Sequence, residues 1–207
     1  MFTSLFREIT RKKVFGNIVA GAATALIMDG ADSLIKNQFC DIVTPRRGSL
    51  LRVDLAGRPF ATGDLCHTGI YLGNNRVAEV TSDDHTGEAL VRIISTRDFL
   101  CGDFPSPRTG LYIYTACGKN SKGRCFALGS EEAAQRAEEL SGSKRGRYNI
   151  LFNNCHMFCY YCLSGIDARS SFSVSSVESL LSRKNGRSEI LWRSTGVGKI
   201  NDKVFKS

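Results

Sequence analysis

The sequence of 207 residues lacks long hydrophobic runs, and no apolar stretch reaches the ~18 residues that a membrane-spanning helix needs. This excludes a polytopic membrane protein. Its eight cysteines are too few and too irregularly spaced for a small disulfide scaffold, which indicates a reducing compartment. Collagen, coiled-coil and repeat signatures are also missing. Because 42% of the residues are hydrophobic, the chain is not disordered, and its length suits one ordinary domain with extensions.

The net charge of +8 is concentrated at the two ends of the sequence. Residues 1–49 carry seven Lys or Arg against four Asp or Glu, and residues 167–207 carry eight against four. Residues 50–166, with thirteen against twelve, are nearly neutral. A neutral unit with basic flanks suggests an anionic partner, either a nucleic acid or an acidic membrane surface. Basic ends that only improve solubility are the alternative.

Two helical segments are predicted before residue 46. Residues 2–13 carry apolar side chains at spacings of three and four, which place them on one helical face. Residues 14–28 are uncharged and end before Asp29–Gly30. A signal peptide is the other interpretation of this start, but the amphipathic pattern differs from a plain basic leader. We therefore expect residues 1–45 to form a helical extension, whose second helix is either buried or in contact with a membrane.

From residue 47 the pattern changes to short strands and then to helices. Alternating or apolar runs bounded by turn residues predict strands at 48–53, 68–80, 90–94 and 111–115. Capping residues predict helices over 130–142 and 154–165, and a further short helix is expected at 174–181. Strands that precede helices indicate an α+β fold rather than a wound parallel sheet.

Only three histidines are present, which makes the search for a catalytic base short. His67 begins a predicted hairpin that turns at residues 73–75. In a two-residue loop Glu79 would face away from His67, whereas a three-residue loop makes the two diagonal neighbours on one face. We prefer the second register because it also gathers Ile70 and Ala78 on the opposite, core-facing side. Glu79 would then orient the imidazole of His67.

Cys155 is the candidate nucleophile, because it follows Asn153–Asn154 at the beginning of a helix. Unpaired N–H groups and the positive end of the helix dipole favour a thiolate there, and they can also hold an oxyanion. Cys159 and Cys162 fall on one face of the same helix and are expected in the core. A zinc site built from these cysteines and His156 is disfavoured by the spacing, and no cofactor or metal is predicted.

The remaining candidates receive structural interpretations. His156 points about 100° around the helix from Cys155, so we expect a partner for the helix start rather than a second base. His85 lies in a polar loop and is assigned no role. Cys66 faces the opposite side of its strand from His67 and is expected to be structural.

Two segments of the sequence resemble the lecithin:retinol acyltransferase family. Residues 66–78, CHTGIYLGNNRVA, resemble its histidine box. Residues 153–158, NNCHMF, followed by YCLSG at 161–165, are similar to its Asn-Cys-Glu-His-Phe box. Residues 130–142 match the family's helix, and Arg46–Ser49 resembles its entry strand. The resemblance covers roughly residues 46–166, with both boxes in the expected order.

The resemblance implies a circularly permuted papain-like or NlpC-type fold, an antiparallel sheet with His67 packed on a helix that starts at Cys155. Members of that family cleave an acyl ester of a phospholipid, hold the acyl group as a thioester and pass it to water, an amine or an alcohol. By position, Cys155 would be the nucleophile, His67 the general base and Glu79 the third polar residue. The catalytic domain would be 46–166, between the extension 1–45 and a basic, Ser-rich extension 167–207.

The sequence departs from the family's pattern at two places. The family's third polar residue is usually a second histidine, where this chain has Glu79. A glutamate can orient an imidazole at least as well, and it would raise the pKa of His67. His156–Met157 replaces the Glu-His pair that follows the family's cysteine, which puts the role of that pair in doubt.

We therefore expect a thiol acyl hydrolase or acyltransferase of the phospholipase A type that acts on glycerophospholipids. A cysteine amidase or peptidase of the NlpC type would use the same dyad, and a non-catalytic basic module would bind membranes or nucleic acid without it. No C-terminal anchor is expected, so contact with a phospholipid membrane surface would be peripheral, and no nucleic acid partner is expected. Synthesis in the cytoplasm is the default, with delivery to another cell as a toxin or effector left open.

Overall fold

The computed structural model describes residues 42–55, 66–83, 85–102, 108, 112–148, 154–167, 173–187 and 189–198. The helices predicted at 2–13 and 14–28, and almost all of the predicted extension 1–45, lie outside the described residues. None of the helices in the described part of the chain is long and apolar enough to span a membrane.

The described residues form one eight-stranded antiparallel sheet with the strand order β6-β5-β1-β2-β3-β4-β7, and β8 pairs with β5. The strands are β1 (Leu50–Asp54), β2 (Cys66–Gly73), β3 (Arg76–Ser82), β4 (Glu88–Ser95), β5 (Tyr112–Lys119), β6 (Cys125–Ala127), β7 (Lys144–Arg147) and β8 (Leu191–Gly198). The α+β class with an antiparallel sheet is confirmed. Strands do not all precede helices, however, because β5, β6, β7 and β8 follow α2 in the chain.

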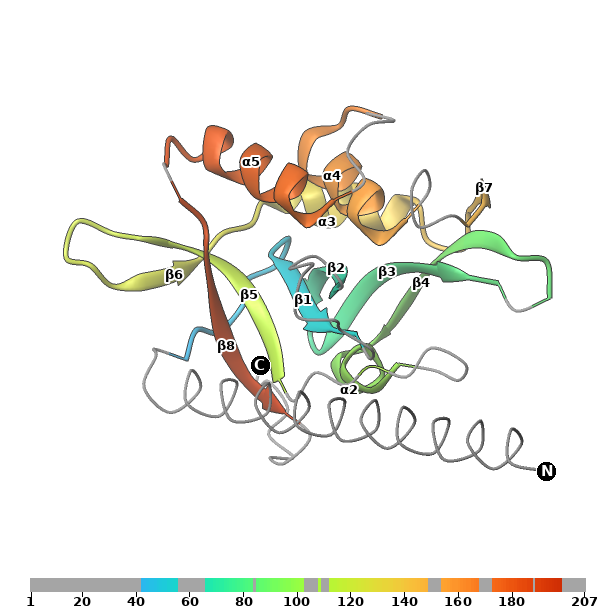
Figure 1. Cartoon of the computed structure of the whole chain (residues 1–207), viewed down its shortest axis with the longest axis horizontal. Coiled ribbons are helices and arrows are strands. Elements are labelled where there is room, and N and C mark those ends of the chain that lie inside the picture. The colour runs from blue at the N-terminus through green and yellow to red at the C-terminus, as the bar shows by residue number, and fades with distance from the viewer. Residues whose placement is uncertain are drawn as a thin grey trace, which may run out of the picture.

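Helices cover the two faces of the sheet unequally. Three of them, α3 (Glu131–Glu139), α4 (Cys155–Ser164) and α5 (Val174–Lys184), lie together on one side, and the short α2 (Thr96–Cys101) lies on the other (Figure 1). The larger apolar core fills the space between the sheet and the three helices. It joins strand residues such as Ile70 and Ala78 to helix residues such as Phe158.

A second, smaller core lies on the α2 side of the sheet. Alternate residues of the strands point to opposite faces, so Tyr71 and Val77 meet Phe99 and Leu100 of α2 while their neighbours face the other helices. His67 and Glu79 share the parity of this second set. The face that carries the candidate histidine and glutamate is thus packed against α2.

The hairpin between β2 and β3 has the preferred register but a different turn. Ile70 lies opposite Ala78, which is the register predicted to bring the candidate histidine and glutamate onto one face. The turn has only two residues, Asn74 and Asn75, both with positive φ. Gly73, at φ 83°, lies in a bulge that shifts the pairing by one residue. The predicted three-residue loop is therefore a two-residue turn plus a bulge, and the extra residue sets the same register.

Helix ends follow the predicted capping residues with one difference. Ser130 caps α3 by accepting a hydrogen bond from the N–H of Ala133, and Asn154 caps α4 in the same manner. Gly165 ends α4 in the left-handed conformation at φ 74°. Helix α3 ends at Glu139, before the predicted terminator Gly142, because residues 140–142 form a turn whose Gly142 N–H donates to β4.

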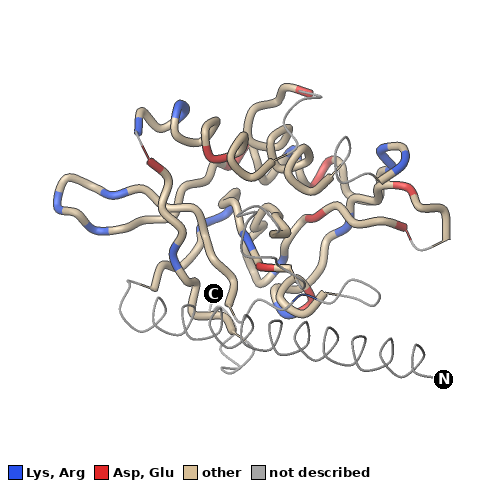
Figure 2. Tube along the Cα trace, viewed as in Figure 1, with Lys and Arg blue, Asp and Glu red and all other residues tan. Residues whose placement is uncertain are grey.

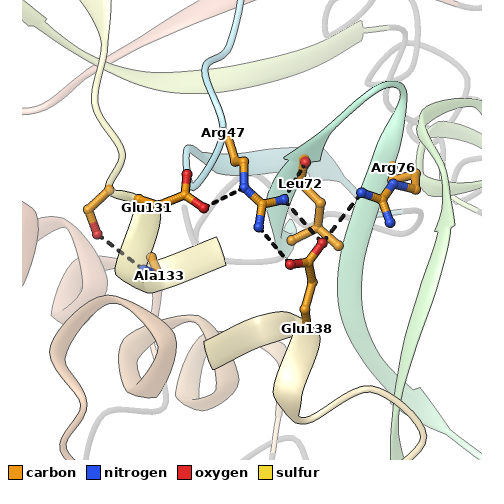
Figure 3. A network of polar contacts seen from close by, with 7 residues as sticks. Arg47, Leu72, Arg76, Glu131, Ala133 and Glu138 are labelled. Atoms are coloured by element: carbon orange, nitrogen blue, oxygen red, sulfur yellow. Dashed lines mark hydrogen bonds and ion pairs between the residues drawn. The ribbon is translucent and has the colours of Figure 1, made fainter. Parts of the chain in front are cut away.

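A network centred on Arg47 fixes α3 to the strands. Its guanidinium donates to Glu131 at 2.8 Å, to Glu138 at 2.6 and 3.1 Å, and to the Leu72 carbonyl at 2.8 Å (Figure 3). Arg76 reaches Glu138 from the next strand at 3.4 Å. Through Glu131 and the bidentate contact with Glu138, Arg47 joins both ends of α3 to the β2–β3 hairpin, although the ion pairs are about one-third or more exposed.

The C-terminal part of the described chain belongs to the same core as the rest. Helix α5 contributes Val177, Leu180 and Leu181 to the larger cluster, and β8 pairs along β5. The division at residue 166 stays a prediction, but α5 and β8 pack against the predicted catalytic domain. Among the described residues, several Lys and Arg positions lie on the β5–β6 hairpin, at the end of α5 and on β7 (Figure 2).

Candidate active site

The candidate base lies near the start of β2, where the strand pairs with β1. His67 stands opposite Val53 and is only 6% exposed. Its Nε2 lies 2.9 Å from Oε2 of Glu79 on β3. An ionised carboxylate can only accept, so Nε2–H donates and Nδ1 is left for another partner. The predicted diagonal contact between these two side chains is present.

Glu79 is fully buried and holds three cationic side chains. Arg92, directly opposite on β4, contacts Oε1 at 2.7 and 2.9 Å, and Arg108 contacts Oε2 at 2.7 Å. Burial favours the protonated acid, but His67, Arg108 and Arg92 together outweigh it and lower the pKa of Glu79 to about 2. The carboxylate is therefore ionised at neutral pH and can orient the imidazole.

Cys155 is the first residue of α4 and is 4% exposed. Burial opposes ionisation of its thiol, but the charges and hydrogen bonds of His156 and His67 lower its pKa well below the ordinary value. The helix N-terminus adds to this effect. In turn, burial opposes the cationic form of His67, while the Cys155 thiolate and Glu79 overcome it and raise the pKa of His67 to about 9.

His156 lies in the site rather than only at the helix start. It is 6% exposed, and its Nδ1 is 3.0 Å from Oγ1 of Thr68, the strand residue after His67. Two consecutive residues of β2 thus contact two consecutive residues of α4. The predicted role as a helix-start partner accounts for the Thr68 contact but not for the contact of His156 with the Cys155 thiolate.

Phe99 of α2 closes the other side of the imidazole. Its ring centroid lies 5.6 Å from that of His67 at an interplanar angle of 47°. Gly69 leaves room for it, because a Cβ at this position would come within 2.9 Å of the Phe99 ring and 2.8 Å of a Val77 methyl group. Only a glycine two residues after the histidine allows α2 to pack this closely.

The structure brings the predicted residues Cys155, His67 and Glu79 together, and their catalytic roles stay a proposal. Sequence reasoning missed two contacts of Glu79. Arg92 could have been found from the β3–β4 hairpin, since the register that closes at residues 83–87 places it opposite Glu79. Arg108 follows α2 in a segment without periodicity, and nothing in its neighbourhood signals a buried ion pair.

Cys66, Cys159, Cys162 and His85 are not part of the Cys155–His67–Glu79 contacts, although Cys159 lies near Thr68 and Cys155. Cys159 and Cys162 are buried in the larger core, where burial raises the pKa of both thiols, that of Cys162 to about 12. Cys66 is buried, as its structural interpretation requires, and His85 is exposed in a turn closed by Asp83. Within the described ranges, no group of three or more His, Cys, Asp or Glu side chains is arranged to hold a metal ion.

Part of the sequence is similar to known proteins. The sequence model described as lecithin retinol acyltransferase matches residues 44–168. The chain is 31% identical to the lecithin retinol acyltransferase of Homo sapiens over 149 residues, 63% of this chain and 59% of that protein. The Bos taurus protein is 35% identical over 56% of each chain, and the Mus musculus protein 28% identical over 76% of this chain and 66% of its own.

The matched region contains the strands β2 and β3 and the helix α4 that position the candidate residues. The chain spans less than two thirds of the length of each of these relatives. The match of the family model covers more than half of this chain, so the chain belongs to the lecithin retinol acyltransferase family.

Proposed function

We propose that this protein is a cysteine-dependent acyl hydrolase or acyltransferase that acts on glycerophospholipids through a thioester on Cys155. The observation that carries the proposal is the contact of the buried Cys155 side chain, whose pKa the site lowers, with His67, whose far nitrogen lies 2.9 Å from the Glu79 carboxylate. The name of the relatives describes an acyl transfer that involves lecithin, a glycerophospholipid, and this supports a lipid ester as the acyl donor.

Acylation of the enzyme begins with the thiolate–imidazolium pair. The Cys155 sulfur attacks the ester carbonyl carbon, and the carbonyl oxygen becomes an oxyanion. When the tetrahedral intermediate collapses, the ester C–O bond breaks and the His67 imidazolium gives its proton to the leaving alkoxide. A lysophospholipid leaves, the acyl group remains as a thioester, and His67 is left neutral.

Deacylation reverses the proton transfer. Neutral His67 accepts a proton from water, or from the hydroxyl of an acyl acceptor, as the oxygen attacks the thioester carbonyl. Collapse of the second intermediate breaks the C–S bond and restores the Cys155 thiolate beside the His67 imidazolium. The carboxylate of Glu79 keeps the ring in the orientation that both transfers need.

Some of the backbone N–H groups at the start of α4 are not available to bind the oxyanion, because the capping side chain accepts them. The side chain of Asn154 accepts the N–H groups of His156 and Met157 at 3.0 Å each, so those two are committed to the cap. We assign the oxyanion to the backbone N–H of Cys155 and the positive end of α4.

Several finer points belong to the same proposal. A circularly permuted papain-like or NlpC-type arrangement is supported by the chain order, since the strand with His67 precedes the helix with Cys155. We propose peripheral contact with a phospholipid surface through basic side chains, which would attract anionic headgroups. Action as a toxin or effector delivered to another cell stays a prediction from the sequence.

The decisive experiment is mass spectrometry of lipids and intact protein after mixing the full chain with mixed phospholipid vesicles. Wild type, Cys155→Ser and the control Cys101→Ser are compared, because Cys101 is exposed at the end of α2 and outside the site. We expect lysophospholipid and an acyl adduct with wild type and Cys101→Ser, and neither with Cys155→Ser.

Two other results would overturn the lipid proposal. Intact lipids together with rapid alkylation of Cys155 at neutral pH would indicate an amidase or peptidase, which uses the same activated thiol. Intact lipids with an unreactive Cys155 would leave a non-catalytic basic binding module.

A further inference from the structure

The candidate base His67 and three neighbouring side chains form a closed ring of contacts. His67 and Arg108 both donate to the same Glu79 oxygen, at 2.9 and 2.7 Å. The second arm of the Arg108 guanidinium donates to the Phe99 carbonyl, and its carbon lies 5.0 Å from the centroid of the Phe99 ring. That ring packs on His67 at 5.6 Å, which closes the circle.

We propose that Arg108 is a positioning residue for His67, which it fixes through two routes: the Glu79 oxygen that it shares with the imidazole, and the Phe99 side chain that packs on the imidazole. The planar guanidinium suits this task, because its two arms reach a carboxylate and a carbonyl at fixed angles. A lysine donates from a single nitrogen and lacks the planar fork that holds both acceptors at fixed angles.

Because Arg108 and His67 share one oxygen of Glu79, Arg108 also lowers the pKa of His67. The two donors lie within about 6 Å of each other, and like charges at such distances disfavour each other's charged form. Arg108 therefore offsets part of the attraction of Glu79 for the His67 proton. A base paired with an unshared buried carboxylate would hold its proton more tightly and release it to the leaving group more slowly.

Other charges around His67 must be held constant in any test. Cys155, Glu79 and Arg108 interact with His67 itself. His156 from α4, Arg92 from β4 and the half-buried Tyr148 after β7 interact with those partners. Arg92 provides the matched control, because it neutralises the same carboxylate through the other oxygen, Oε1.

The test uses the full chain labelled with ¹⁵N-histidine, whose three imidazoles give few NMR signals. His85→Asn and His156→Asn variants assign the signals, and each is followed through a pH titration on both sides of pH 9. We expect a wild-type midpoint for His67 of about 9 and a rise of about one unit in Arg108→Gln. Arg108→Lys, which keeps the charge, should restore the midpoint, and Arg92→Gln should move it much less.

An unchanged midpoint in Arg108→Gln, or an equal shift in Arg92→Gln, would overturn the proposal. If Arg108→Gln does not fold, Arg108→Lys still tests the positioning role of Arg108. The lysine should move the His67 ring-proton shifts, since the Phe99 ring loses its tether, and wild-type shifts in this variant would contradict the positioning role.

Only the catalytic consequence rests on the proposed function. In the vesicle assay, Arg108→Gln should slow turnover about tenfold or more, with Arg108→Lys recovering part of it. A midpoint shift in a protein that forms no acyl adduct would support Arg108 and refute the lipid chemistry. An acyl adduct without a shift of the His67 midpoint would support the lipid chemistry and refute the role of Arg108.

Discussion

Replacing Glu79 by glutamine tests the role of the buried carboxylate that His67, Arg92 and Arg108 share. The amide is nearly the same size but carries no charge, so it leaves Arg108 and Arg92 without their shared anion. Because the native site lowers the pKa of Glu79 from 4.5 to about 2, its ionisation contributes about 3 kcal/mol to stability at neutral pH. Glu79→Gln should lower the free energy of unfolding by about this amount.

The stabilisation by the Glu79 carboxylate should depend on pH and decrease in acid. A carboxylate with a depressed native pKa stabilises the fold above pH 4.5, and this contribution is lost as the pH falls towards 2. Urea unfolding of wild type and Glu79→Gln at a series of pH values should therefore show a gap of about 3 kcal/mol at pH 7 that closes through this window. The variant should also titrate His67 below its native midpoint of about 9.

Glu138→Gln is the matched control, because it removes a carboxylate that also has two arginine partners. Its side chain is 31% exposed, and its contacts with Arg47 and Arg76 lie at the surface. Water screens such pairs, so the loss should stay within about 1 kcal/mol. A gap for Glu79→Gln that is as small as the control's, or that does not change with pH, would refute the reasoning about the buried carboxylate.

Two further predictions concern the support of the site. Gly69→Ala places a Cβ 2.9 Å from the Phe99 ring, and thermal unfolding should show a loss of about 2 kcal/mol, with wild-type stability as the contradicting result. Asn154→Ala should cost about 1 kcal/mol, as should the control Ser130→Ala at the equivalent cap of α3. Asn154→Asp keeps the cap but adds an anion beside Cys155, which disfavours the thiolate. The alkylation rate of Cys155 at neutral pH should therefore fall in this variant, whereas Ser130→Ala should leave that rate unchanged.

Much of the fold could be predicted because its local signals agree. Alternation of apolar residues identified the β2–β3 hairpin, and the requirement for a buried face selected its register over the alternative. Capping residues identified the starts of α3 and α4. The pairing of β8 with β5 could not be predicted, because the two strands lie about eighty residues apart in the sequence. The sequence of β8, LWRSTGVG, also lacks the alternation of apolar and polar residues that would predict a strand.

The candidate site divides in the same way. Cys155, His67 and Glu79 could be identified because two of them lie in one hairpin and the third at a helix start, and each has a local signal for its chemistry. Arg108 has none. It reaches Glu79 by way of α2, whose approach depends on the close packing at Gly69, and this packing becomes visible only when the elements are assembled.

The arginines explain how a glutamate can stand where the resemblance to the family leads one to expect a second histidine. A buried carboxylate is costly unless cations surround it, and Arg92 and Arg108 supply two in addition to His67. In the proposed mechanism Cys155 and Glu79 are the two anions, so that, with His156 not counted, these three cations leave one positive charge in excess near the proposed nucleophile. That excess favours the additional negative charge that appears on the substrate oxygen as the sulfur attacks. A histidine introduced at position 79 would add no anion to this set, so Glu79, Arg92 and Arg108 have to be regarded as one unit rather than as a single exchanged residue.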